Sequence, residues 1–134
     1  MMTLPFVISG KVIHGQSLGN EYDIPTANIE PCEDTSDLAH GVYYSVACIS
    51  GRDYASITNL GIRPTVSDDG RVNAETFIYD YDGDIYGREI KVTLLDFRRG
   101  ERRFDSVDEL FETIRKDLDE GLEYHRARSS MASV

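Results

Sequence analysis

The chain has 134 residues, a mass of 15.1 kDa and a formal net charge of −10, with 40% hydrophobic and 28% charged residues. This length suits a single domain with its own core, and the composition excludes a disordered chain. The acidity argues against a general nucleic-acid binder and against a partner of anionic membrane surfaces. We therefore predict one domain over residues 1–134 with an acidic, soluble surface.

Targeting signals and cysteine usage bear on the compartment. No stretch approaches the roughly 20 apolar residues of a membrane helix, and residues 1–6 lack the features of a secretory signal. Cys32 and Cys48 lie far apart without a Cys-x-x-Cys motif. We expect a cytoplasmic protein with reduced thiols.

Most of the chain has the pattern of β-strands. Five stretches are rich in β-branched and aromatic residues: 6–13, 41–50, 54–60, 75–81 and 89–97. A turn at residues 51–53 predicts a hairpin between the second and third of them. Because no helical pattern separates the strands, they indicate antiparallel pairing in an all-β barrel or sandwich.

One helix is predicted near the end of the chain. Ser106 and Glu109 have the spacing of a capping box. Apolar residues then recur at helical spacing: Val107, Leu110, Phe111, Ile114, Leu118 and Leu122. Gly121 is a weak point, and the tail 127–134 has no periodicity and is expected to be flexible.

Two loops with glycine and proline are candidates for ligand binding. Gly10 and Gly15 have the spacing of a Walker A loop, but Gln16 replaces the lysine, which excludes that motif. Turn glycines around a strand are the simpler interpretation. The motif Pro25-Thr-Ala-Asn28 offers a hydroxyl and an amide oxygen, ligands that suit Mg²⁺. The alternative is a turn in which Thr26 and Asn28 cap local backbone groups.

Two charged features complete the candidates. Glu75, at the predicted start of a strand, is a possible general base or a solvated carboxylate. The basic cluster 97–104 could bind an anion or stack on a flat ligand, or it could balance the acidic helix that follows. His14, His40 and His125 have no metal-ligand spacing.

Taken in order, these segments resemble the riboflavin kinase (flavokinase) family. The matching stretches are the glycine loop 10–19, Pro25-Thr-Ala-Asn28, Asn59-x-Gly61-x-x-Pro64-Thr65 leading to Glu75-Thr76, and Tyr86-Gly87 leading to Arg98-x-x-Glu101-x-x-Phe104. Gly41-Val-Tyr43 fits as well, and the resemblance runs from about Phe6 to Tyr124.

The resemblance implies a fold and an activity. The fold is a closed six-stranded antiparallel Greek-key barrel with one C-terminal α-helix. The activity is transfer of the ATP γ-phosphoryl group to the 5′-hydroxyl of riboflavin with Mg²⁺ or another divalent cation, giving FMN. We expect a monomer that acts on ATP and riboflavin, with neither nucleic acid nor membrane as partner. The kinase barrel is expected here without the FAD synthetase domain to which it is fused in many bacteria, either as a stand-alone kinase or as an excised module of a longer chain.

The resemblance also implies roles for particular residues. Glu75 matches the proposed base, and Thr26 and Asn28 match the metal ligands. ATP binding is assigned to Gly10, Lys11, Gly15, Gly19 and Thr26. Flavin binding is assigned to Phe97, Arg98, Glu101 and Phe104.

The chain departs from the family pattern before Pro25. Asn20 and Asp23 stand where a basic residue and a glycine are usual, so this loop is acidic. That difference motivates an alternative function, a flavin- or nucleotide-binding module with weak or no turnover and a regulatory role. A third possibility is an interaction domain that retains the barrel without a ligand.

Overall fold

Six antiparallel strands and one helix make up the fold, which we describe from a computed structural model of residues 3–13, 26–62, 71–81, 83 and 85–132. The chain divides into two compact units, residues 1–101 and 102–134. The first unit contains all the strands: β1 (Phe6–Lys11), β2 (Thr26–Ile29), β3 (Gly41–Ile49), β4 (Arg52–Ile62), β5 (Val72–Ile78) and β6 (Glu89–Gly100). The second contains the helix α1 (Val107–Ala132).

The strand order in the sheet is β1-β6-β3-β4-β5-β2. Strands β3, β4 and β5 form consecutive antiparallel pairs, and β6 returns to lie beside β3. This arrangement of four strands is a Greek key. The prediction of six antiparallel strands in Greek-key order with a C-terminal helix is therefore confirmed.

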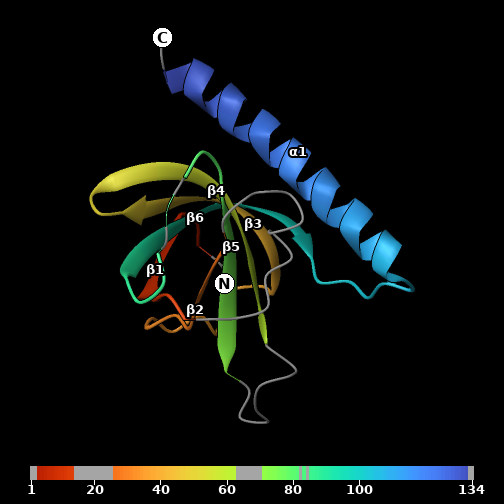
Figure 1. Ribbon diagram of the computed structural model, residues 1–134, viewed down its shortest axis with the longest axis horizontal. Helices are drawn as coiled ribbons and strands as arrows, with labels where there is room; N and C mark the ends of the chain where they lie inside the picture. The colour runs from red at the N-terminus through yellow and green to blue at the C-terminus, as the bar shows by residue number, and fades with distance from the viewer. Residues whose placement is uncertain (1–2, 14–25, 63–70, 82, 84, 133–134) are drawn as a thin grey trace. The chain divides into compact units, whose positions relative to one another are not determined.

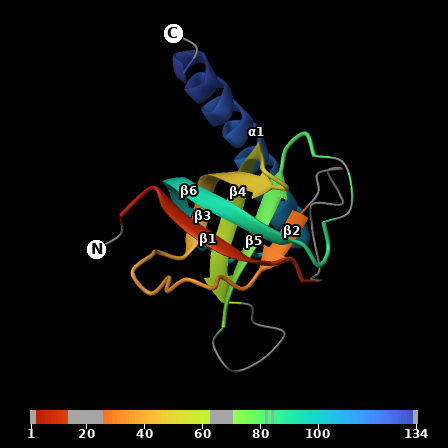
Figure 2. The same ribbon diagram turned by 90° about the vertical axis from the view of Figure 1, so that its left-hand side faces the viewer.

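The predicted closure of the barrel is wrong, because the sheet is an open, curled half-barrel whose edge strands are β1 and β2 (Figures 1 and 2). The reason lies in the hydrogen bonds of Ser9 on β1. Its N–H donates to Glu33 Oε1 (2.7 Å), and its C=O accepts from Cys32 N–H (2.9 Å). These groups face the side where β2 would have to pair, so the segment after β2 occupies this part of the β1 edge.

The core lies inside the curled sheet. The sheet bends so that β1 and β6 face β5 and β2 (Figure 2). Alternate residues of these strands are buried and point inward. Fully buried members include Ile8, Ile29, Leu60, Ile78 and Leu94. Burial of these side chains is the main driving force for the curled sheet.

A short polar network crosses the same interior. Ser45 Oγ lies 2.7 Å from Ser56 Oγ and 2.8 Å from Thr58 Oγ1, and Thr58 Oγ1 lies 2.9 Å from Thr76 Oγ1. All four side chains are fully buried. Because each hydroxyl has a partner, the network avoids the penalty of an unpaired polar group in a core.

The predicted hairpin between β3 and β4 is confirmed, with its turn one residue earlier than expected. Ile49 pairs with Arg52, and the two residues between them have positive φ, 52° at Ser50 and 81° at Gly51. Two such residues form the type I′ turn that matches strand twist.

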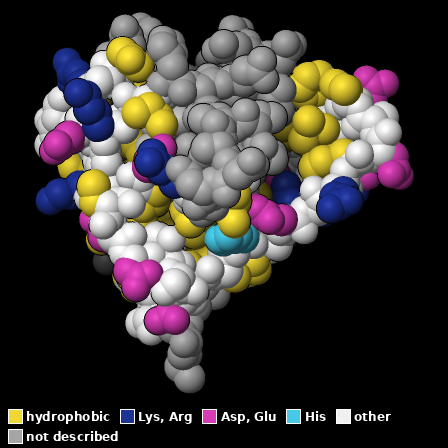
Figure 3. Space-filling view, turned by 90° about the horizontal axis from the view of Figure 1, so that it is seen from below, with side chains coloured by type: hydrophobic (Ala, Val, Ile, Leu, Met, Phe, Trp, Pro, Cys, Tyr) yellow, Lys and Arg dark blue, Asp and Glu magenta, His cyan; other side chains and the backbone are white. Residues whose placement is uncertain are grey.

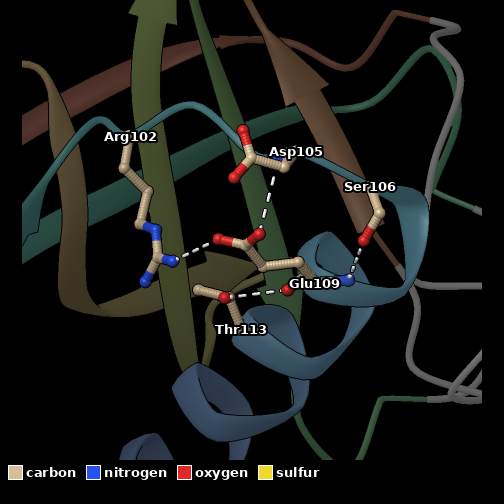
Figure 4. Close-up of polar contacts among 5 residues, drawn as sticks. All are labelled: Arg102, Asp105, Ser106, Glu109 and Thr113. Atoms are coloured by element: carbon tan, nitrogen blue, oxygen red, sulfur yellow. Dashed lines mark hydrogen bonds and ion pairs between the residues drawn. The ribbon is translucent and has the colours of Figure 1, made fainter.

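The helix begins as the capping motif predicts. Glu109 N–H donates to Ser106 Oγ (3.1 Å), and Leu110 N–H donates to Ser106 O (3.2 Å). In a complete capping box the Glu109 carboxylate would reach back to the Ser106 N–H. Figure 4 shows it instead accepting from Asp105 N–H (3.3 Å) and from Arg102 Nη2 (2.6 Å).

The helix is longer than its apolar pattern predicts. It passes through Gly121 and ends at Ala132, although no helical pattern was recognised after residue 126. In addition, Thr113 Oγ1 donates to Glu109 O (2.9 Å) within the first turns (Figure 4).

None of the described helices is long and apolar enough to cross a membrane. Cys32 and Cys48 are free cysteines, as expected.

Candidate functional site

The site is built on one face of β2, β5 and β4. Thr26 and Asn28 lie two residues apart on β2 and therefore share a face, opposite to that of the core residues Ala27 and Ile29. The Pro-Thr-Ala-Asn motif was considered as a turn, but its last three residues begin a strand. Strand geometry thus directs both candidate ligand side chains to the same side.

Asn28 on β2 is directly opposite Glu75 on β5. The Asn28 carbonyl accepts from Ile13 N–H (2.8 Å), on the side away from β5. Because the N–H and C=O of one strand residue point the same way, Asn28 and Glu75 form a non-hydrogen-bonded pair. In such pairs the Cα atoms are about 4.5 Å apart and the side chains are closer than in hydrogen-bonded pairs.

Glu75 lies inside β5, and not at the mouth of a strand as its position in the sequence suggested. It is partly buried, and on its other side it is opposite Asn59 of β4. The backbone of Glu75 is thus held between two neighbouring strands. This position fixes the side chain beside Asn28 more firmly than a loop would.

Asn73 was not identified from the sequence and belongs to the same face. It lies two residues before Glu75 on β5, and its Nδ2 donates to Asn28 Oδ1 (3.0 Å). Asn28 is only 4% exposed. The signal that could have identified Asn73 is its alternation with Glu75, which places both side chains on one face of a strand.

Glu101 reaches this face from the end of the sheet unit. A Cβ added at Gly61 of β4 would overlap Glu101 Oε1, so the carboxylate fills the space that a side chain at 61 would take. Gly61 is opposite Asn73 in the sheet. The structure therefore places Glu101, a predicted flavin-binding residue, near the strands that carry Asn73 and Glu75.

Two of the residues assigned to ATP binding lie in β1. Gly10 and Lys11 are paired with Ile90 and Glu89 of β6 and lie within the strand predicted over residues 6–13. A Cβ added at Gly10 would lie 2.9 Å from Glu30 O. The close approach of this backbone therefore explains why position 10 is a glycine. Gly15 and Gly19 lie outside the described residues.

The residues assigned to flavin binding are divided between the two units. In the sheet unit, Phe97 is 37% exposed and packs edge-on against Tyr43, with ring centroids 5.1 Å apart. Arg98 Nη1 donates to the hydroxyl of Tyr44 (3.1 Å). In the helix unit, the Arg102 guanidinium lies 5.0 Å from the centroid of the Phe104 ring.

Two arginines of the predicted basic cluster 97–104 contact other side chains. Arg102 is paired with Glu109, and Arg98 is bonded to a tyrosine. Figure 3 shows the acidic and basic side chains of one face scattered among other residues. The described part of the chain contains no group of three or more His, Cys, Asp and Glu side chains arranged to hold a metal.

The donor set at Thr26, Asn28 and Asn73 consists of a hydroxyl and two amides. Within the described residues, Asn73 Oδ1 is buried and has no hydrogen-bond partner. Neutral oxygens of this kind fit a hard cation such as Mg²⁺, which takes few protein ligands and keeps waters and phosphate oxygens as the rest. The neighbouring Glu75 carboxylate is able to accept a proton from a hydroxyl.

Comparisons with known proteins agree on one family. A family profile described as riboflavin kinase (Flavokinase) matches residues 2–125. A bifunctional riboflavin kinase/FMN adenylyltransferase of Pseudomonas fluorescens is 37% identical over 114 residues, covering 85% of this chain and 36% of the relative. The RNA-binding riboflavin kinase RibR of Bacillus subtilis is 36% identical over 112 residues, covering 84% of this chain and 48% of the relative. The chain thus spans less than half the length of these two relatives.

Solved structures show the same fold. A protein from Streptococcus pneumoniae described as a macrolide-efflux protein matches with a TM-score of 0.72 and 34% identity, covering 86% of this chain and 38% of that one. A riboflavin kinase from Trypanosoma brucei matches with a TM-score of 0.62, covering 91% of this chain and 80% of that one. At 23% identity, the second likeness concerns the fold alone.

Proposed function

Because the chain belongs to the riboflavin kinase family, we propose that it transfers the γ-phosphoryl group of ATP to the 5′-hydroxyl of riboflavin, giving FMN and ADP. The observation that carries the proposal is the pair of Asn28 and Glu75, which are directly opposite each other on neighbouring strands. A candidate cation ligand and a candidate base thus lie side by side. We also propose that the protein is cytoplasmic and monomeric.

Glu75 is the proposed base. Its carboxylate takes the proton of the riboflavin hydroxyl while that oxygen forms a bond to the γ-phosphorus. The bond between the γ-phosphorus and the bridging oxygen of ADP breaks, and ADP takes the electron pair. Phosphoryl transfer depends mainly on positioning and on stabilisation of charge, so a base held rigidly inside a strand suits it.

Thr26 and Asn28 are the proposed ligands of a divalent cation. When bound, the cation would neutralise charge on the phosphate oxygens. The protein fixes the positions of both residues, because they lie in β2 and the Asn28 carbonyl accepts a hydrogen bond from the Ile13 N–H. Gly10, Lys11, Gly15 and Gly19 keep their predicted role toward the phosphates.

The flavin side of the site is proposed at Phe97, Arg98, Glu101 and Phe104. Phe97 offers an exposed part of its ring for stacking, and Glu101 lies over Gly61. An aromatic ring that can stack and a carboxylate that can accept N–H groups are the kinds of side chain that suit a flat ligand with N–H groups. This assignment rests on the family and on those contacts.

The test is incubation with riboflavin and MgATP, followed by chromatographic separation of FMN. We expect FMN to form in proportion to enzyme and to require the divalent cation. Tight binding of riboflavin without any FMN would contradict the kinase and favour the binding module with a regulatory role. Absence of both would contradict the family's substrate for this chain.

A further inference from the structure

Asn73 has no role in the reaction as described above, yet it contacts a residue that does. Its Nδ2 donates to Asn28 Oδ1 at 3.0 Å across the β2–β5 pair. Asn28 is 96% buried and Asn73 is partly buried, so the Asn28 end of this bond is shielded from competing water. The contact joins the proposed cation ligand to the strand that carries the proposed base.

The hydrogen bond from Asn73 determines whether the oxygen or the nitrogen of the Asn28 side-chain amide faces Asn73. An amide side chain is nearly symmetric in shape and presents either oxygen or NH₂ after a half-turn. A donor at Asn73 requires the oxygen. Since an amide oxygen accepts at two positions, one remains for a cation while Asn73 uses the other.

A second observation points to a ligand on Asn73 itself. Its Oδ1 is buried and has no hydrogen-bond partner among the described residues. Buried polar atoms in native proteins are rarely left unpaired, and an exception needs a donor that the protein does not supply. A water on a bound cation is such a donor, because Mg²⁺ keeps several of its waters in protein sites.

We propose that Asn73 is a positioning residue of the cation site, holding Asn28 with its amide N–H and accepting a hydrogen bond from a cation-bound water with Oδ1. The inference rests on the proposed function, which assigns Asn28 to the cation. It adds a residue that the family resemblance did not indicate. Partners of this kind typically change metal affinity by 10- to 100-fold when they are removed.

The experiment measures Mn²⁺ binding in the presence of ADP by electron paramagnetic resonance, which detects the free ion directly and needs no turnover. Asn73→Leu has nearly the same shape and removes both hydrogen bonds. We expect its Mn²⁺ affinity to fall about 10- to 100-fold. The matched control is Asp53→Ala, an exposed site near the start of β4 and outside the stretch of β4 that pairs with β5, which should bind like the wild type.

Asn73→Ala serves as the second variant and as the main one if the leucine variant fails to fold by circular dichroism. In steady-state assays the Mg²⁺ activation constant should rise, while the Michaelis constant for riboflavin stays within about twofold. Unchanged Mn²⁺ affinity in either folded variant would overturn the inference even if the wild type makes FMN. A wild type that makes no FMN and binds no Mn²⁺·ADP would overturn the proposed function and, with it, this inference.

Discussion

Among the candidate site residues, Glu75 lies between two asparagines of neighbouring strands. It is opposite Asn28 on one side and Asn59 on the other. Because strands on both sides fix its backbone, the proposed base has a defined position beside the proposed cation ligand Asn28.

Replacement of Glu75 by glutamine tests this role. The change preserves shape and removes the proton acceptor, so we expect kcat for FMN formation to fall by about 10²- to 10⁴-fold. Binding of riboflavin and MgADP should remain within about threefold, measured by flavin fluorescence and calorimetry. The matched control is Glu89→Gln, an exposed carboxylate at the start of β6. Near-normal turnover in the Glu75 variant would show that the residue is a solvated carboxylate.

At the residue scale, the sequence identified candidate site residues but not the side chains that contact them. Thr26, Asn28 and Glu75 were identified because their residue types and order match a family. Asn73 was missed because a single asparagine in a polar stretch has no distinctive pattern. Its contact with Asn28 depends on the register of β2 against β5, which joins residues 45 positions apart.

The edge of β1 is the element whose hydrogen bonds depend most on one side chain. Glu33 accepts from the Ser9 N–H (2.7 Å) and from Ser9 Oγ (2.5 Å). Partial burial raises the pKa of the Glu33 carboxyl, but the hydrogen bonds from Ser9 outweigh it, and the pKa is lowered overall from 4.5. A carboxyl with a lowered pKa stabilises the folded state above its unfolded pKa, and this contribution is lost as pH falls through the folded value.

We therefore expect Glu33→Gln to lower the free energy of unfolding at pH 7 by about 1 kcal/mol, the low end for a bond to a charged group because the site is partly exposed. The difference from the wild type should shrink as the pH falls from about 5 to 3. Urea denaturation at several pH values measures it. Glu30→Gln is the control, since Glu30 forms an exposed ion pair with Arg71 at 3.5 Å. A pH-independent difference would contradict the charge-based explanation.

The start of α1 depends on Ser106. Its Oγ accepts from the Glu109 N–H (3.1 Å), which satisfies one of the free donors of the first turn. Ser106→Ala should lower the free energy of unfolding by about 1 kcal/mol, whereas Ser106→Asp should retain most of it. Urea denaturation followed by circular dichroism compares the variants. Equal stability of the alanine variant and the wild type would show that the remaining contacts of Glu109 suffice.

At the element scale, periodicity predicted the long strands and the start of the helix but not the short or closing elements. The strand β2 has four residues, and proline before it made the motif look like a turn. Closure of the barrel could not be judged from any strand alone. Closure depends on whether the free edge of β1 pairs with β2 or with the segment that follows β2. The hydrogen bond from Ser9 to the Glu33 side chain favours the segment after β2.

At the scale of the whole molecule, the charge of the chain bears on its partners. One relative, RibR of Bacillus subtilis, is named as RNA-binding, and this chain matches 48% of its length. The chain here has 14 basic and 24 acidic residues, a net charge of −10. Backbone contacts to RNA need clustered lysines and arginines, which the face in Figure 3 does not show among its described residues.

We therefore expect no saturable binding of single- or double-stranded RNA at physiological salt, measured by fluorescence anisotropy up to about 10⁻⁴ M protein, the weak end of non-specific affinity. Lowering the salt from 200 to 50 mM strengthens typical non-specific complexes by orders of magnitude, so that condition is the more demanding test. A lysine-rich peptide of similar size is the positive control. Binding that becomes much tighter at low salt would contradict the prediction and would mean that local basic groups outweigh the net charge. Binding that is insensitive to salt would point instead to stacking of bases on exposed aromatic rings such as Phe97, and competition by riboflavin would then show whether RNA and flavin use the same surface.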